Sequence, residues 1–195
     1  MNRKIALIIL VALAAGGCSI PHRPAEDYQQ YLINNDEKSN LPTTSLETAY
    51  VLTPDTIAHQ VEFRSATVGY ANVWIVEFGK MLETTLQSED LQEAFGRLSR
   101  QLDDEEFAGY LTTFDLLDYQ FYDYGAHVTL AIAVSKNGEE IFHKTYDQDG
   151  KTQGGKMFWG GVFAMKNAIQ QSTKLAVDQI ITDFINNLNN EYPDI

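Results

Sequence analysis

Residues 128–146 read VTLAIAVSKNGEEIFHKTY, and this stretch decides the fold. Large apolar residues alternate with small or polar ones along its first half, which is the period of a half-buried β-strand. Asn137-Gly138 then supplies the two positive-φ residues of a type I′ turn, so the stretch predicts a β-hairpin. A two-residue loop would place Val134 opposite Ile141.

The segments on either side of this hairpin carry further strand and helix patterns. Short apolar or alternating runs predict strands at 49–52, 61–64 and 111–122. Apolar residues spaced by three and four predict helices at 72–86, at 88–102 and over a long amphipathic segment at 165–188. We therefore expect an α+β fold in a single domain, with a mainly antiparallel sheet and helices packed on one face.

The N-terminal segment is organised like a secretory signal peptide. Arg3 and Lys4 form a short basic region, residues 5–15 are apolar, and two glycines precede Cys18. The apolar run is shorter than the roughly 20 residues that a membrane-spanning helix needs. Residues 15–18, AGGC, resemble the bacterial lipobox, in which the cysteine becomes the acylated first residue of the mature protein. A plain secretory signal with a cysteine near its cleavage site is the alternative.

We therefore divide the chain into a lipoprotein signal peptide (1–17), a lipidated N-terminus with a flexible tether (18–46) and a periplasmic α+β domain (47–195). The tether is polar, has room for one short helix near Tyr28, and as coil would span roughly 30 Å. Ser19 follows the cysteine, and by resemblance to the enterobacterial sorting rule this favours the outer membrane over the inner one. Acyl chains such as palmitate would then anchor the protein without crossing the membrane.

The charge balance argues against nucleic acid as a partner. The chain carries 14 Lys and Arg against 27 Asp and Glu, a formal net charge of -13, whereas phosphate backbones are bound by basic surfaces. Removal of residues 1–17 takes away Arg3 and Lys4 but no acid, which leaves -15 on the mature protein. Anionic headgroups would repel such a domain, so the acyl chains rather than surface charge must hold it at the membrane.

No arrangement of residues predicts catalysis, a cofactor or a metal. The HExxH, GxSxG, SxxK and phosphate-binding glycine motifs are absent from the sequence. The four histidines do not have the spacing of a metal site; they are His22, His59, His127 and His143. An acylated Cys18 is also unable to act as a nucleophile or a ligand. We therefore expect no enzymatic activity, no cofactor and no metal.

Two aromatic segments are the candidate contact sites. Residues 118–125, DYQFYDYG, end a strand, and alternation puts Tyr122 and Tyr124 on one face. Residues 154–161, GGKMFWGG, present Met157, Phe158 and Trp159 on a loop tip between two glycine pairs. Large apolar side chains at such positions are typical of contact surfaces, so we expect these five residues to meet a partner or a lipid. For the second segment, a loop folded over the core is the alternative.

These features, taken in order, resemble a family of small bacterial lipoproteins. The matching features are Cys18 after a signal, the strand Tyr50-Val51-Leu52, Arg64 followed by Tyr70 and Trp74, the hairpin at 128–146, and a terminal helix rich in Ala and Ile. The chain resembles the auxiliary components of ABC-type intermembrane lipid transport, the family of the paraquat-inducible operon lipoprotein. The resemblance implies a non-enzymatic periplasmic domain that binds a lipid or an envelope protein complex, such as an ABC transporter or its substrate-binding component.

The hairpin and the last helix are equally similar to other small envelope lipoproteins, those of the YajG type and the lipopolysaccharide-assembly lipoprotein. An envelope assembly or structural role is therefore the alternative. An envelope hydrolase is a further alternative, and it would need His127 or His143 in a pocket with a carboxylate and a hydroxyl.

Overall fold

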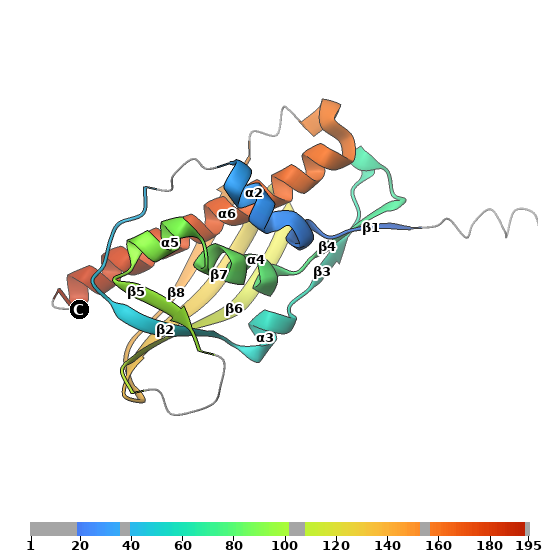
Figure 1. Cartoon of the computed structure of the whole chain (residues 1–195). Helices are drawn as coiled ribbons and strands as arrows, with labels where there is room; N and C mark the ends of the chain where they lie inside the picture. The colour runs from blue at the N-terminus through green and yellow to red at the C-terminus, as the bar shows by residue number, and fades with distance from the viewer. Residues whose placement is uncertain (1–18, 36–39, 102–107, 153–156, 194–195) are drawn as a thin grey trace, which may run out of the picture.

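A five-stranded sheet runs through the middle of the molecule (Figure 1). Its order is β5 (Arg97–Arg100), β2 (Glu47–Leu52), β6 (Tyr110–Tyr122), β7 (Gly125–Lys136) and β8 (Glu139–Lys151). β2 is parallel to both of its neighbours, whereas β6, β7 and β8 form an antiparallel meander. The computed structural model describes residues 19–35, 40–101, 108–152 and 157–193. The α+β fold is confirmed, and the sheet is mixed: the long pairings of β6, β7 and β8 are antiparallel, whereas the short pairings of β2 are parallel.

A three-stranded sheet lies at one end, in the order β1 (Ile20–His22), β4 (Asn72–Val76) and β3 (Val61–Phe63). β1 is parallel to β4, and β3 is antiparallel to it. The shorter helices are η1 (Pro24–Asp27), α2 (Tyr28–Asn34), α3 (Pro54–Ala58), η2 (Ala66–Val68), α4 (Phe78–Leu86) and α5 (Glu89–Ala94). The strands expected at 49–52, 61–64 and 111–122 are therefore confirmed.

The long helix α6 (Met157–Glu191) crosses one face of the five-stranded sheet, and α2, α4 and α5 lie beside it (Figure 1). Its apolar stripe, which includes Ile169, Ile180 and Phe184, is fully buried and belongs to one core with the facing residues of β7 and β8. The amphipathic helix expected at 165–188 is confirmed. Close packing is possible because a Cβ on Gly150 of β8 would lie only 1.7 Å from the Ser172 carbonyl oxygen.

The hairpin at 128–146 forms, but its register differs from the expected one. A bulge between Val134 and Ser135 shifts the pairing by one residue, so Val134 lies opposite Phe142 rather than Ile141. The shift turns Phe142 toward α6, where its ring is 5.6 Å from that of Phe184. A larger aromatic side chain thereby enters the core, and Ile141 is only half-buried.

The helix expected at 72–86 is a strand followed by a helix. Residues 73–76 form an unbroken apolar run, with exposed fractions between 0% and 8%. β4 is the central strand of the small sheet and is covered on both faces, so it needs apolar residues at every position. Such a run also matches the spacing of a buried helix, and for this reason the sequence pattern was ambiguous.

The helix expected at 88–102 is also shorter than predicted. α5 ends at Ala94, and residues 97–100 instead form β5 beside β2. Gly96 lies between them, where an added Cβ would be 2.6 Å from the Ser45 carbonyl oxygen. The chain therefore turns tightly at this glycine, and Leu98 is buried from a strand rather than from a helix.

Residues 20–34 belong to the segment that was expected to be a flexible tether, but they form regular secondary structure. They contain β1, η1 and α2, and the expected short helix near Tyr28 is α2. Tyr28 has no exposed surface, and its hydroxyl lies 3.3 Å from the Thr85 hydroxyl. Gln170 of α6 donates a hydrogen bond to the Pro24 carbonyl at 2.8 Å. This segment is thus part of the core, because α6 and α4 cannot bury their faces without it.

The signal peptide (1–17) and Cys18 lie outside the described residues. Among the helices that the structure describes, none combines the length and the apolar character needed to span a membrane.

Candidate functional site

The turn between β6 and β7 has an unusual backbone. Asp123 (φ 47°) and Tyr124 (φ 59°) are both left-handed, and Tyr122 pairs with Gly125 across them. The turn between β7 and β8 has the same conformation but uses Asn137-Gly138, the residues that suit it best. A left-handed tyrosine costs about 1–2 kcal/mol, and such strain is concentrated at functional sites. The turn at 122–125 is therefore a candidate site.

Tyr122 is held flat on the outer face of the sheet, away from α6. Its ring stacks on His127 with the centroids 3.7 Å apart and the planes at 5°. His127 in turn contacts the Asp149 carboxylate through Nδ1. The stack fixes the Tyr122 side chain, yet 55% of it remains exposed. A rigid, exposed aromatic ring of this kind loses little entropy when a partner covers it.

Two hollows share this turn. One, of about 470 Å³, is lined by Tyr122, Asp123, Tyr124, Gly125, His127, Asp149, Lys151 and Thr152. The other, of about 310 Å³, lies on the side of the three-stranded sheet, with Phe63, Arg64, Ser65 and Met165 facing the turn. Thr152 donates its hydroxyl hydrogen to the Tyr124 carbonyl at 2.9 Å, which ties the turn to the end of β8. We call residues 122–125 and these two hollows the turn site.

The groups at the turn site include a histidine, a carboxylate and a hydroxyl. His127 and Asp149 form two members of a triad, and Thr152 lies in the same hollow. The Thr152 hydroxyl is committed to a backbone carbonyl, however, and the described residues place no hydroxyl or thiol in hydrogen-bond contact with His127. No group of three or more His, Cys, Asp or Glu that could hold a metal occurs in the described part of the chain.

The structure brings together only part of the predicted contact set. Tyr122 is exposed and Tyr124 is half-buried against the core, both at the turn site. Met157, Phe158 and Trp159 begin α6, so the backbone here is a helix start and not a loop tip. Their side chains lie outside the described residues. The helix that begins at Met157 is interrupted at the glycine pair that follows, where Gly161 has a non-helical backbone (φ 56°, ψ -135°).

Three exposed apolar side chains at the same end of the molecule were not predicted. Phe163 is 85% exposed, Tyr70 is 68% exposed and Ile20 is 52% exposed. Arg64, also exposed, donates from Nη1 to the Tyr70 carbonyl. Arg64 and Tyr70 belong to the family resemblance, which assigns them no role, and Phe163 precedes the helix expected at 165–188.

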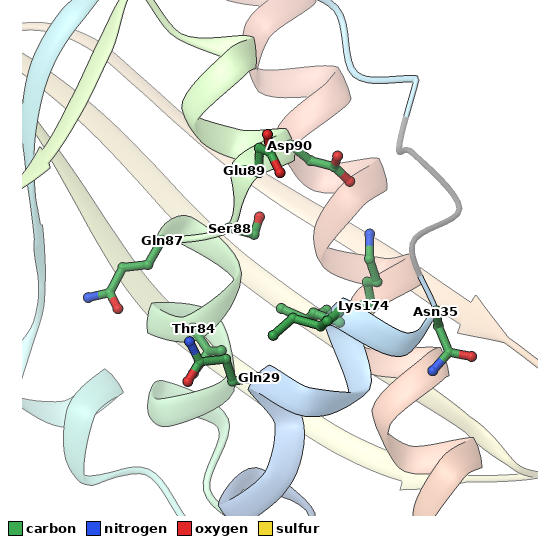
Figure 2. A pocket seen from close by; sticks show the side chains of 10 residues that line it. Gln29, Asn35, Thr84, Gln87, Ser88, Glu89, Asp90 and Lys174 are labelled. Atoms are coloured by element: carbon green, nitrogen blue, oxygen red, sulfur yellow. The ribbon is translucent and has the colours of Figure 1, made fainter.

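A further hollow of about 310 Å³ lies among α2, α4, α5 and α6 (Figure 2). It is lined mostly by amide, hydroxyl and carboxylate side chains from the ends of these helices, including Gln29, Thr84 and Ser88. Lys174 is the cation on its wall, and Lys174 donates to the Asp178 carboxylate at 2.6 Å. The lysine is therefore paired with a carboxylate one turn further along the same helix.

Comparison with solved structures finds a similar fold in protein XCC0632 from Xanthomonas campestris, of the DUF330 family. The TM-score is 0.50 at 12% sequence identity, over 78% of this chain and 90% of that one. The hypothetical protein CT253 from Chlamydia trachomatis matches with a TM-score of 0.38 and 10% identity, over 75% of this chain and 97% of that one. No family model and no curated protein sequence matches the chain. The likeness to XCC0632 is one of fold.

Proposed function

We propose that this protein is a non-enzymatic lipoprotein, anchored by acyl chains on Cys18 with its domain in the periplasm, that binds an envelope protein through the turn site. Its role would be that of an auxiliary component of an ABC-type intermembrane lipid transport system. An envelope assembly or structural lipoprotein is the nearest alternative. The outer membrane is the proposed location, because Ser19 follows the cysteine.

The observation that carries the proposal is the exposed Tyr122 ring fixed on His127 and Asp149. Aromatic side chains held rigidly beside hollows are typical of the centres of protein interfaces. The ring lies beside the strained left-handed residues Asp123 and Tyr124, and such strain is concentrated at functional sites. The lipobox-like sequence at 15–18 supports the anchor, and the order of strands and helices supports the family.

Site-directed crosslinking in the native envelope tests the binding site. A photoreactive amino acid at Gln120, an exposed position on the same face of β6 as Tyr122, should capture a component of the transport system. The capture should fall several-fold in the Tyr122→Ala variant. Thr145→Ala, an exposed change on the same sheet face, is the matched control and should leave the capture unchanged. Equal capture by all three proteins, or none by any, would refute the turn site.

A hydrolase is the second candidate, because His127, Asp149 and Thr152 line one hollow. A triad would require His127 to deprotonate the Thr152 hydroxyl. His127→Ala and Thr152→Val variants separate the two functions. The proposed binding role predicts that Thr152→Val, which removes the hydrogen bond to the Tyr124 carbonyl, weakens partner capture only in part, whereas a hydrolase would lose its activity completely in both variants.

A further inference from the structure

We infer that the domain lies directly on the membrane surface, with an apolar rim formed by Ile20, Tyr70 and Phe163 inserted at the lipid interface. The inference rests on the proposed acylation of Cys18. It adds an orientation and a second contact to the anchor, and it replaces the expected flexible tether with a fixed attachment.

The position of β1 sets the distance between the anchor and the domain. Ser19 is the first described residue, and Ile20 is already hydrogen-bonded, its N–H donating to the Ala71 carbonyl at 2.8 Å. Because a chain reaches at most about 3.3–3.6 Å per residue, an anchor two residues before Ile20 has a reach of only about 7 Å from β1. The acyl chains therefore leave the molecule at β1.

The three residues of the apolar rim come from elements at the end of the molecule where β1 lies. Ile20 pairs in parallel register with Asn72, two residues after Tyr70, so the N-terminal end of β1 points toward Tyr70. η2, in the loop that contains Tyr70, packs against α6, and Phe163 lies in the part of α6 just after its break at Gly161. Figure 1 shows β1 leading out of the molecule at the end where this loop and the start of α6 lie.

The chemistry of the apolar rim fits a lipid interface. Tyrosine and arginine are favoured at the headgroup level, and Arg64 is exposed and bonded to the Tyr70 carbonyl. The 85% exposed Phe163 side chain loses contact with water if it enters the acyl boundary. The acidic charge of the chain opposes attraction to anionic lipids, so the contact must be apolar. The bilayer that holds the acyl chains is the surface that the rim meets first.

The turn site remains accessible in this orientation. Tyr122 lies on the sheet face opposite α6, whereas Phe163 is on α6 and Tyr70 is in the turn between η2 and β4. A partner bound at Tyr122 would therefore stand beside the membrane, next to the anchored end of the domain.

Spin labelling of the processed, lipidated protein tests the inference. The chain has one cysteine, and acylation of Cys18 removes its thiol, so Tyr70→Cys and Phe163→Cys each provide a single labelling position. Leu117→Cys is the matched control, since Leu117 is also an exposed apolar residue at 55% but lies on the outer sheet face. Glu139→Cys at the far hairpin is a second control. The proteins are reconstituted in phosphatidylethanolamine and phosphatidylglycerol vesicles.

Collision with oxygen reports the lipid phase and collision with a water-soluble nickel chelate reports the aqueous phase. We expect the ratio of oxygen to nickel accessibility to be several-fold higher at positions 70 and 163 than at 117 and 139. Equal nickel accessibility at all four positions on acylated protein overturns the inference and leaves the proposed function standing. Shielding of 70 and 163 from both reagents would indicate a protein contact and also overturns it. If the mass of the purified protein shows that Cys18 carries no acyl chains, both proposals are wrong.

Discussion

At the residue scale, two similar turns in one sheet differ in what they contain. Both turns need two residues with left-handed backbone. Asn137-Gly138 adopts this conformation readily, whereas Asp123-Tyr124 adopts it with a loss of stability, because a tyrosine side chain disfavours positive φ. The strained turn is the one that carries an exposed, stacked aromatic ring. A residue that opposes local propensity indicates a site where something other than stability decides the sequence.

His59 packs against Tyr119 of β6, and its protonation tests this packing. Burial lowers the pKa of His59 below its ordinary value of 6.5, and Asp118 opposes the shift. The unfolded chain then binds the proton more readily than the folded domain. The contribution of neutral His59 to stability is therefore complete above pH 6.5 and is lost as the pH falls below that value.

Urea unfolding at about pH 7.5 and about pH 5.5 measures this contribution. We expect the wild-type domain to lose more free energy of unfolding between the two pH values than the His59→Asn variant. The same loss in both proteins would mean that burial of His59 does not shift its pKa.

At the scale of elements, the N-terminal segment tests whether the chain after Cys18 is a tether or part of the core. Tyr28 is fully buried, so Tyr28→Ala should lower the free energy of unfolding by about 3–5 kcal/mol. Tyr28→Phe keeps the ring and removes one hydrogen bond, at about 1 kcal/mol. Ile33→Ala on the same helix, at a 63% exposed side chain, should change stability by less than about 0.5 kcal/mol. A flexible segment would instead give three small and similar values in denaturant unfolding.

Gly150 tests the contact between β8 and α6. An alanine there places its Cβ 1.7 Å from the Ser172 carbonyl oxygen, so the strand and the helix must separate. We expect Gly150→Ala to cost at least about 1–3 kcal/mol in free energy of unfolding. Thr145→Ala, on the exposed side of the same strand, should cost less than about 0.5 kcal/mol. Thermal unfolding of the two variants at equal concentration measures the difference, and equal melting temperatures would rule out the close contact.

Local patterns were sufficient to predict elements whose two faces differ. The hairpin at 128–146 and α6 alternate between apolar and polar sides, and both were placed correctly. β4 was missed because it is buried on both faces, and β1 was missed because three residues carry no period. The register slip at Val134 could not be foreseen, since a bulge is selected by packing against α6 rather than by the turn.

Some residues of the candidate site could be predicted from the sequence, and others are brought together only by the fold. The aromatic cluster at 118–125 was visible in the sequence, and Tyr122 lies exposed at the turn site, while its contact with a partner or a lipid stays a prediction. The stacking partner His127 and its carboxylate Asp149 come from two other strands, so only the paired register of β6, β7 and β8 brings them together. The exposure of Phe163 could not be predicted from the sequence, because the exposure of one residue depends on what the rest of the fold covers.

At the scale of the whole molecule, the described chain begins at the end that carries the apolar rim, and the turn site is at that end on another face. If the signal is removed as proposed, the protein carries a net charge of -15 and is repelled by anionic lipids, so we expect the proposed attachment to depend on the acyl chains and on the apolar rim. A fixed attachment would present the turn site to a partner at a constant height above the bilayer. The far hairpin at Asn137 would point into the periplasm.

The mass of the N-terminal proteolytic peptide, taken from protein purified out of its native envelope, tests the central claim most directly. Acylation of Cys18 predicts a peptide that begins at Cys18 and carries a thioether-linked diacylglyceryl group and an amide-linked acyl chain. A peptide that retains Met1, begins after Cys18, or contains Cys18 with a free thiol would contradict it.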